Sequence, residues 1–163
     1  MITSSLETRP LCNYDADSER PAGPPQEWAR AESRPRILYV DDDATIRKVG
    51  MMLLTRSGYH VDTAADGLEA LAALRASPYN LLITDHQMPR LTGLQLAAQA
   101  RLAGMNLPIV LASGSVEALE DTDSEWLGFA ARLAKPFNVE ALLETVSQAL
   151  SAPTEDYARA AAR

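Results

Sequence analysis

Carboxylates, a hydroxyl and a lysine follow four short apolar runs of this 163-residue sequence. The groups at the ends of these runs are Asp41-Asp42-Asp43, Asp85, Ser113 and Lys135. Each has an ordinary explanation on its own, because acidic residues favour helix starts and lysines extend from surfaces. Their shared position after apolar runs instead indicates a common site. Lys135 strengthens this indication, since it is one of only two lysines among 15 basic residues.

Three carboxylates at one site would repel one another. At a separation of ~4 Å, one like-charged pair costs roughly 4 kcal/mol at an effective dielectric constant of 20. Either some of these carboxyl groups are protonated or a cation lies among them. Oxygen ligands in an incomplete protein cage favour Mg²⁺, which completes its shell with water and phosphate oxygens. A lysine and a hydroxyl opposite the metal would bind the other phosphoryl oxygens. These residue types predict phosphoryl transfer to a carboxylate nucleophile without a general base.

The apolar runs alternate with segments of helical periodicity. Strands are expected at residues 36–40, 59–63, 81–84, 108–112 and 131–134, and helices at 44–57, 67–76, 92–103 and 139–150. In the first helix Ile46, Val49 and Leu53 recur at helical spacing. This alternation predicts an α/β fold, a doubly wound five-stranded parallel sheet with right-handed crossovers. Such sheets place their sites beyond the carboxyl ends of the strands, where the polar groups lie.

Composition excludes several classes of function. A net charge of -7 argues against nucleic acid or an anionic membrane as the default partner. The single cysteine, Cys12, excludes an internal disulfide and a cysteine-rich zinc site. The start of the chain does not resemble a signal peptide, and no run approaches the ~18 apolar residues of a membrane span. We therefore expect a cytoplasmic protein.

The distribution of proline and aliphatic residues predicts three regions. Residues 1–33 hold four of the ten prolines and few aliphatic residues, so we expect a disordered N-terminal extension. The folded domain is expected at 35–151, followed by a C-terminal tail at 152–163. Thirteen residues after Leu150 are too few for a DNA-binding module. We therefore expect a stand-alone domain whose output passes through a partner, a dimer or a phosphorelay.

Four motifs resemble one known family. At these separations "ILYVDDDATIR", "LLITDHQMP", "IVLASGS" and "LAKPF" are similar to the receiver domain of two-component response regulators, in the CheY-like superfamily, over about residues 35–150. The resemblance implies a (βα)5 flavodoxin-like fold. It also implies a phosphoprotein in which Asp85 becomes an aspartylphosphate by transfer from a histidine kinase. Such a domain is not an enzyme for another substrate and catalyses only its own phosphorylation and dephosphorylation.

The same resemblance implies a set of site residues and partners. Asp42, Asp85 and the backbone carbonyl of Gln87 would bind Mg²⁺ directly, and Asp41 would act through water. Ser113 and Lys135 would contact the phosphoryl group. The implied partners are a histidine kinase or phosphotransfer protein and an unidentified downstream protein. A homodimer is a further expectation. It would form through the fourth helix of the (βα)5 pattern, which falls in the segment 116–129, together with the fifth strand and the last helix.

The chain departs from the family pattern at two places. Arg132 stands where the family usually has an aromatic residue three before the lysine, so the usual switch residue is replaced. Residues 116–129 carry five acidic residues and no basic one, which predicts a solvated acidic face with Trp126 and Phe129 as anchors. His60 and His86 are expected to be ordinary residues, because no second metal ligand is placed beside them.

Two alternative functions remain open from the residues alone. "ILYVDDDAT" also fits the start of haloacid-dehalogenase-like phosphatases, with Asp41 as nucleophile and Asp43 as acid/base. That assignment leaves Asp85 without a role, and no acidic pair follows a strand after Lys135. The second alternative is a receiver-like binding module that works without phosphorylation.

Overall fold

The computed structural model describes residues 34–114 and 127–152 of the chain. The predicted N-terminal extension, the tail beyond residue 152 and the acidic segment up to Trp126 lie outside the described residues. Predictions about those segments stay predictions, and so does the homodimer, since part of its surface would come from the acidic segment. Within the described ranges no helix has the length and apolar character that a membrane crossing requires.

Five parallel strands form a single sheet in the order β2-β1-β3-β4-β5. The strands are β1 Arg36–Val40, β2 His60–Ala64, β3 Leu81–Asp85, β4 Ile109–Ser113 and β5 Ala131–Ala134. The predicted α/β fold with a doubly wound five-stranded parallel sheet is therefore confirmed. Three strands begin or end one residue from their predicted positions. The pattern of apolar residues locates a strand in the sequence, but it does not determine which residue makes the last hydrogen bond of that strand.

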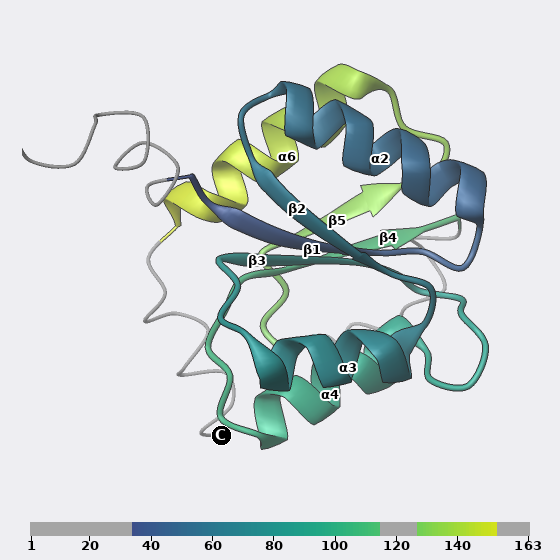
Figure 1. Ribbon diagram of the computed structural model, residues 1–163, viewed down its shortest axis with the longest axis vertical. Helices are drawn as coiled ribbons and strands as arrows, with labels where there is room; N and C mark the ends of the chain where they lie inside the picture. Colours follow the sequence, from purple (N-terminus) through teal and green to yellow (C-terminus); the bar gives the residue numbers. More distant parts are fainter. Residues whose placement is uncertain (1–33, 115–126, 153–163) are drawn as a thin grey trace, which may run out of the picture. The chain divides into compact units, whose positions relative to one another are not determined.

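Two pairs of helices cover the two faces of the sheet (Figure 1). The helices α2 Ala44–Arg56 and α6 Val139–Ser151 pack on one face, and α3 Gly67–Ala76 and α4 Gly93–Leu102 pack on the other. Each helix begins after a side chain that accepts hydrogen bonds from its first turn; these N-caps are Asp43, Asp66, Thr92 and the predicted Asn138. Capping satisfies backbone N–H groups that the helix itself leaves unpaired.

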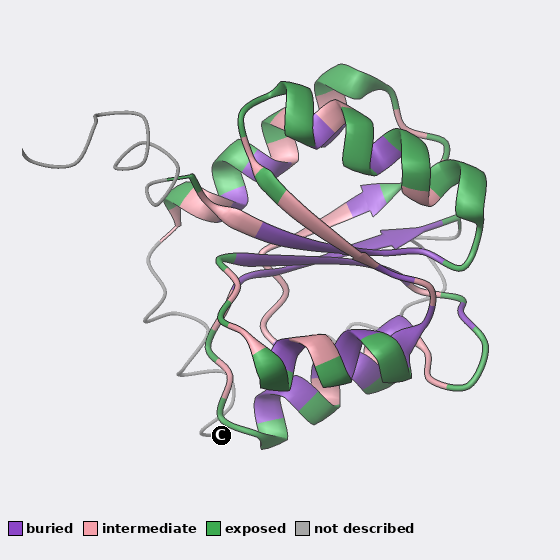
Figure 2. Cartoon of the chain, viewed as in Figure 1, coloured by how far each residue is buried: buried purple, intermediate pink, exposed green. Residues whose placement is uncertain are grey.

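Alternating residues of each central strand supply two separate cores. On β1, Ile37 and Tyr39 face α2 and α6, whereas Leu38 and Val40 face α3 and α4. All four side chains are buried, and Figure 2 shows the same burial along the central strands. Burial on both faces explains why these strands are nearly continuous apolar runs in the sequence.

Helix α2 turns a different face to the core from the one its apolar spacing suggests. Gly50 and Leu54 are the buried residues of this helix, while Ile46 and Val49 are 38% and 45% exposed. The Tyr39 ring causes this arrangement, because a Cβ atom on Gly50 would lie 2.5 Å from its Cζ atom. Only glycine lets the helix pack directly on the ring, and the apolar residues beside it are left at the surface.

A buried arginine ties α4 to two other segments. The Arg101 side chain is 4% exposed, and its Nη1 donates to the carbonyl oxygens of Met105 at 2.8 Å and Leu107 at 2.9 Å. Its Nε donates to Leu127 at 2.9 Å and its Nη2 to Gly128 at 3.1 Å. The guanidinium group thereby fixes the start of the segment that leads into β5. Sequence inspection gave no sign of this role.

A cluster of Arg36, Asp62 and Tyr79 links strands near their amino ends. Asp62 on β2 accepts from Arg36 Nε at 2.7 Å and from the Tyr79 hydroxyl at 3.0 Å. Partial burial would raise the pKa of Asp62, but the hydrogen bonds from Arg36 and Tyr79 outweigh it and lower the pKa. The cluster joins β1, β2 and the approach to β3 at the edge opposite the predicted site.

Gly93 offers a test of how tightly α4 packs against the end of β3. A Cβ atom at this position would overlap the backbone carbonyl oxygen of Asp85. We expect Gly93→Ala to lower the free energy of unfolding by about 1–3 kcal/mol, although alanine favours a helix by about 1 kcal/mol. Urea denaturation measures the change. Gly114→Ala is the matched control, because no atom of the described residues lies within 4 Å of its added Cβ. Equal stability of the two variants would contradict this packing.

Candidate functional site

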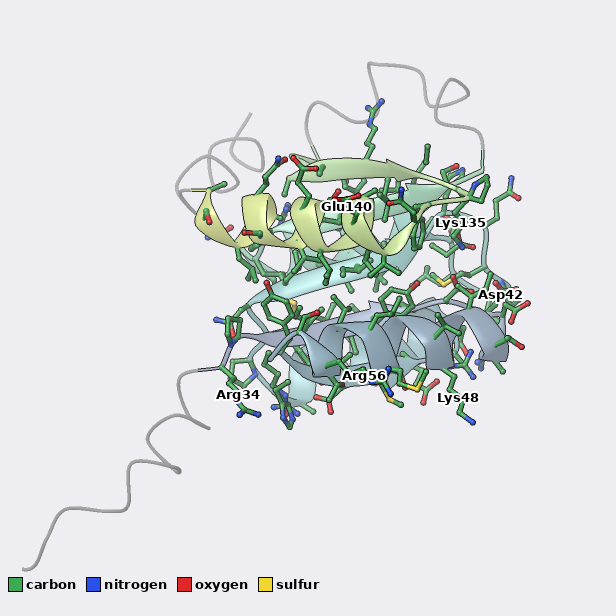
Figure 3. All side chains as sticks on the ribbon, turned by 90° about the horizontal axis from the view of Figure 1, so that it is seen from above. Arg34, Asp42, Lys48, Arg56, Lys135 and Glu140 are labelled. Carbon is green, nitrogen blue, oxygen red and sulfur yellow. The ribbon has the colours of Figure 1, made fainter. Side chains whose placement is uncertain are left out.

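Strand register brings the predicted polar groups to one edge of the sheet. The cross-strand pairs that set this register are Val40–Thr84, Asp85–Ala112 and Ser113–Ala134. Asp41 therefore follows β1 at the level of Asp85 on β3, and Lys135 follows β5 just beyond Ser113 on β4. Figure 3 shows Asp42 and Lys135 at this same edge. The structure thus assembles groups that are up to 94 residues apart in the chain.

The Lys135 ammonium lies between two buried carboxylates. Its Nζ atom is 2.8 Å from Asp41 Oδ2 and 2.8 Å from Asp85 Oδ1. Asp41 is 2% exposed and Asp85 8% exposed, so both carboxylates depend on this one ammonium for charge compensation within the described residues. One positive charge shared by two negative ones leaves the site with excess negative charge.

The surroundings shift the pKa values of the groups at this edge. Burial raises the pKa of Asp41, and the hydrogen bond from Lys135 offsets this only in part. Burial would lower the pKa of Lys135, but its hydrogen bonds to Asp41 and Asp85 raise it, so the lysine stays protonated. Burial, followed by the nearby carboxylates of Asp41 and Asp85, also raises the pKa of Tyr39.

The three acidic residues after β1 have different environments. Asp41 is buried and accepts a hydrogen bond from the backbone N–H of Asp43 at 3.0 Å. Asp42 is exposed at the rim. Asp43 accepts from the N–H groups of Ile46 and Thr45 at the start of α2, and these bonds lower its pKa. Its carboxylate is therefore engaged as a helix cap, which leaves the acid/base role of the phosphatase alternative without support.

Arg47 is a site residue that the sequence analysis missed. Its Nη1 donates to the backbone carbonyl oxygens of Asp41 at 2.7 Å and Asp42 at 3.3 Å. The arginine lies one turn into α2, four residues after the cap at Asp43. Only this spacing could have indicated the contact in the sequence. A side chain four residues after the cap lies on the same side of the helix and can reach the preceding acidic loop. The contact holds the acidic loop against the helix.

A second loop, between β3 and α4, is held at several points. His86 donates its backbone N–H to Ala112 at 2.8 Å and accepts from Gly93 at 3.0 Å. Arg90 has a left-handed backbone, with φ of 67°, and its side chain forms an ion pair with the buried carboxylate of Asp66. An arginine in this conformation carries strain that its surroundings must offset. The ion pair fastens the loop that carries Gln87 to the start of α3.

The remaining predicted residues have simpler positions. Ser113 is buried at the end of β4, and its carbonyl accepts the backbone N–H of Lys135 at 2.8 Å. Gln87 is exposed in its loop, and Arg132 lies half-buried in the middle of β5. The Nδ1 atom of His86 is buried without a hydrogen-bond partner among the described residues. A switch role for Arg132 stays a prediction.

The donor atoms at this edge fit a hard divalent cation. In the described ranges no three His, Cys, Asp or Glu side chains are grouped as a ready-made metal cage. The buried carboxylates of Asp41 and Asp85 nevertheless carry more charge than Lys135 compensates, and Asp42 stands exposed beside them. An oxygen-only set with open positions suits Mg²⁺, which keeps several waters and binds phosphate oxygens.

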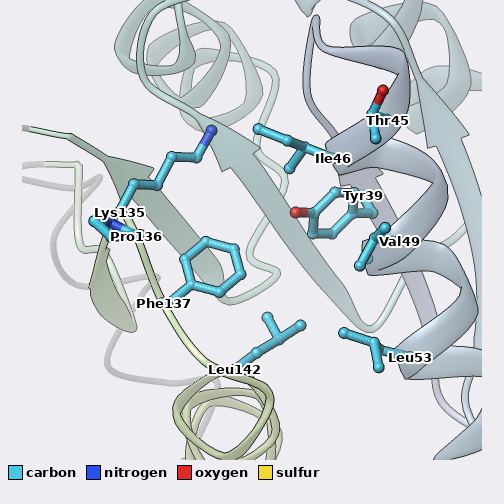
Figure 4. A pocket seen from close by; sticks show the side chains of 10 residues that line it. Tyr39, Thr45, Ile46, Val49, Leu53, Lys135, Pro136, Phe137 and Leu142 are labelled. Carbon is cyan, nitrogen blue, oxygen red and sulfur yellow. The ribbon is translucent and has the colours of Figure 1, made fainter.

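A pocket of about 500 Å³ opens next to Lys135, between α2 and α6. Figure 4 shows its lining side chains, with Phe137 and Leu142 on one side and Val49 and Leu53 on the other. The lining is largely apolar, in contrast to the charged edge beside it.

Comparison with known proteins identifies the family. The response regulator receiver domain matches residues 37–147. Response regulator MprA of Mycobacterium avium is 38% identical over 108 residues, covering 66% of this chain and 47% of the relative. MprA of Mycolicibacterium vanbaalenii is 36% identical over 121 residues, covering 74% and 52%. The chain thus spans about half the length of the curated relatives it matches.

Solved structures give the same result. The chemotaxis response regulator CheY4 of Vibrio cholerae has a TM-score of 0.68 and 32% identity, covering 72% of this chain and 99% of that one. Response regulator TrrA of Thermotoga maritima, in complex with Mg²⁺ and BeF, has a TM-score of 0.64 and 34% identity, covering 70% and 97%. Sequence, fold and the grouped Asp, Ser and Lys residues agree, and the chain belongs to the response regulator receiver domain family of two-component signalling.

Proposed function

We propose that Asp85 accepts a phosphoryl group from a histidine kinase or phosphotransfer protein. The main support is the Lys135 ammonium, which lies 2.8 Å from carboxylate oxygens of both Asp41 and Asp85. Asp85 ends the central strand β3, where the sheet presents it at the carboxyl edge. The resulting aspartylphosphate is the signal, and the domain acts on no other substrate.

Mg²⁺ would be held by Asp42, Asp85 and the backbone carbonyl of Gln87, with Asp41 acting through water. When bound, the metal would neutralise charge that develops on the phosphoryl oxygens. The excess negative charge at the edge supports this assignment, as does the Mg²⁺ and BeF complex of the TrrA relative. Arg47 and the Arg90–Asp66 ion pair would hold the two loops that supply these oxygens.

The chain's own residues suffice for the remaining steps of transfer. The Asp85 carboxylate attacks phosphorus directly, because an ionised carboxylate needs no base. The P–N bond to the donor histidine breaks as the O–P bond forms, and the electron pair stays on the donor nitrogen. The Lys135 ammonium then exchanges its contact with the Asp85 carboxylate for one with the negatively charged phosphoryl group. The Ser113 hydroxyl donates to another phosphoryl oxygen.

Asp41 is a poorer nucleophile than Asp85 in this arrangement. One of its oxygens accepts from Lys135 and the other from the backbone N–H of Asp43, and the residue is 2% exposed. These contacts disfavour the phosphatase alternative. The stand-alone organisation stays a prediction, because the curated relatives extend well beyond the matched region.

Chemical trapping tests the phosphoacceptor. Incubation with acetyl phosphate or a cognate kinase should add one phosphate, only when Mg²⁺ or Mn²⁺ is present. Borohydride reduction followed by mass spectrometry should place the modification on Asp85. Asp85→Asn should fold and take up no phosphate, because the amide is not a nucleophile.

The same experiment separates the three functions. The phosphatase alternative predicts modification of Asp41 and turnover of phosphate esters. The binding-module alternative predicts no modification at all. Phosphate that persists on Asp85→Asn would refute the proposal.

Metal binding should appear as a stability change. At a hundred times its Kd, Mg²⁺ should raise the free energy of unfolding by about 2.7 kcal/mol, because it binds the folded state only. Asp42→Asn should remove most of this gain in thermal unfolding. Burial raises the pKa of Asp41, so protons should compete with the metal as the pH falls from neutral, and the gain should shrink. A gain that Asp42→Asn retains would place the metal elsewhere.

Lys135 should act as the internal counterion of the metal-free site. Lys135→Ala leaves the carboxylates of Asp41 and Asp85 without their shared ammonium, so the metal-free melting temperature should fall. Mg²⁺ should then raise that temperature more in the variant than in the parent protein, since it restores the missing positive charge. Lys48→Ala, which removes the other lysine at an exposed position of α2, should change neither value. An equal Mg²⁺ effect in parent and Lys135→Ala would exclude this role.

A further inference from the structure

The loop between β3 and α4 contains a strained turn at Arg90. Its backbone is left-handed, with φ of 67°, and the Leu91 N–H donates across it to the carbonyl oxygen of Pro89 at 2.8 Å. Glycine adopts such a backbone readily, whereas a residue with a Cβ atom is strained in it. Arginine therefore stands where the backbone favours glycine, and strain of this kind persists only when the surroundings hold it in place.

The Arg90 side chain is the charge partner of a buried carboxylate. The side chain of Asp66 is 3% exposed and that of Arg90 is 61% exposed. One Asp66 oxygen accepts from the N–H groups of Leu68 at 2.8 Å and Glu69 at 3.0 Å, at the start of α3. The other oxygen pairs with the Arg90 guanidinium. Both carboxylate oxygens are thereby engaged, and Arg90 is fastened to the start of a helix.

Packing brings the same loop and helix together. A Cβ atom on Gly67 would lie 2.5 Å from the carbonyl oxygen of Leu91, so glycine lets the loop lie directly against the first turn of α3. Met88 is 7% exposed and packs in the core that α3 and α4 share with the sheet. Among the described residues, the Arg90–Asp66 contact is the one ion pair that this loop makes.

The attachment bears on the metal because Gln87 lies in the same loop, three residues before Arg90. The proposed function assigns its backbone carbonyl oxygen to Mg²⁺. This ion demands near-ideal octahedral geometry, so a ligand oxygen that is free to move binds it weakly. Partners that orient a metal ligand typically contribute roughly ten- to hundredfold in metal affinity.

We propose that Arg90 is a positioning residue for the metal site, and that its ion pair with Asp66 holds the Gln87 carbonyl oxygen in the orientation that Mg²⁺ requires. This role rests on the proposed function and adds to it two residues outside the proposed ligand set. The start of α3 thereby contributes to metal affinity through the loop that it holds.

Charge alone predicts the opposite effect for the arginine. Removing a cation near a metal site reduces repulsion, so Arg90→Gly would then tighten Mg²⁺ binding. If the ion pair orients the loop, Arg90→Gly should instead weaken binding roughly tenfold. Asp66→Asn keeps a good helix cap and should weaken binding to a similar extent. The double variant should bind no more weakly than either single variant, because both substitutions remove the same pair.

Mg²⁺ titration of the full chain, followed by amide NMR shifts, measures these affinities, and the same spectra verify the fold of each variant. Arg75→Ala is the matched control. It removes an exposed arginine from the last turn of α3 and should leave the Kd for Mg²⁺ unchanged.

Arg90→Ala separates positioning from stability. Both Arg90 variants lose the ion pair, but glycine relieves the strain of the left-handed backbone and alanine does not. Arg90→Gly should therefore have the higher melting temperature of the two and still bind Mg²⁺ no more tightly than Arg90→Ala does.

Three results would overturn this role. The first is a folded Arg90→Gly that binds Mg²⁺ as tightly as the parent or more tightly, as charge alone predicts. The second is a double variant whose loss of affinity is the product of the two single losses. The third is affinity that follows the melting temperature across Arg90→Gly and Arg90→Ala. A parent protein that binds no Mg²⁺ would instead refute the metal assignment of the proposed function, and this role with it.

Discussion

Two carboxylates share a single ammonium at the carboxyl edge of this sheet, and much of the surrounding structure keeps these three groups together. Asp41 and Asp85 are delivered by adjacent parallel strands, so they lie close whether or not a cation is present. Lys135 compensates part of their charge from the last strand. Neither carboxylate can be moved away without breaking the register of the sheet. Electrostatic repulsion between the two carboxylates is thus built into the fold.

Loops around the edge restrict the motion of these groups further. Arg47 binds backbone carbonyls of the acidic loop, and the Arg90–Asp66 ion pair fastens the loop after β3. Both contacts use cationic side chains, yet neither places its charge directly between the two carboxylates. The guanidinium groups therefore hold the loops at this edge without pairing with the carboxylates of Asp41 and Asp85 themselves. Preorganisation of this kind lowers the cost of binding because fewer groups must be ordered at that moment.

The central features of the fold and site could be predicted because they depend on simple periodic rules. Apolar runs that alternate with helical segments require parallel strands, and parallel strands place their carboxyl ends together. Asp85, Ser113 and Lys135 could be assigned to one edge from that rule alone. The caps at Asp43 and Asn138 follow equally local rules, since each side chain bonds to N–H groups two or three residues ahead.

Features that depend on packing between distant segments could not be predicted. The spacing of Ile46 and Val49 suggested a core face for α2, but the Tyr39 ring takes that space and Gly50 meets it instead. Arg101 reads in the sequence as an ordinary helix residue, and only the folded chain brings four carbonyl groups around it. Its role depends on loops whose paths no local pattern specifies.

The 94 residues that separate Asp41 from Lys135 have a consequence for the protein during its synthesis. A growing chain that has reached only α4 already contains Asp85 but not the lysine that compensates its charge. The ammonium arrives only after β5 has left the ribosome and paired with β4. Unfinished or truncated chains therefore hold an acidic edge in which Asp41 and Asp85 lack the ammonium that they share in the folded domain. Completion of the last strand therefore supplies the positive charge to carboxylates that are already present in the chain.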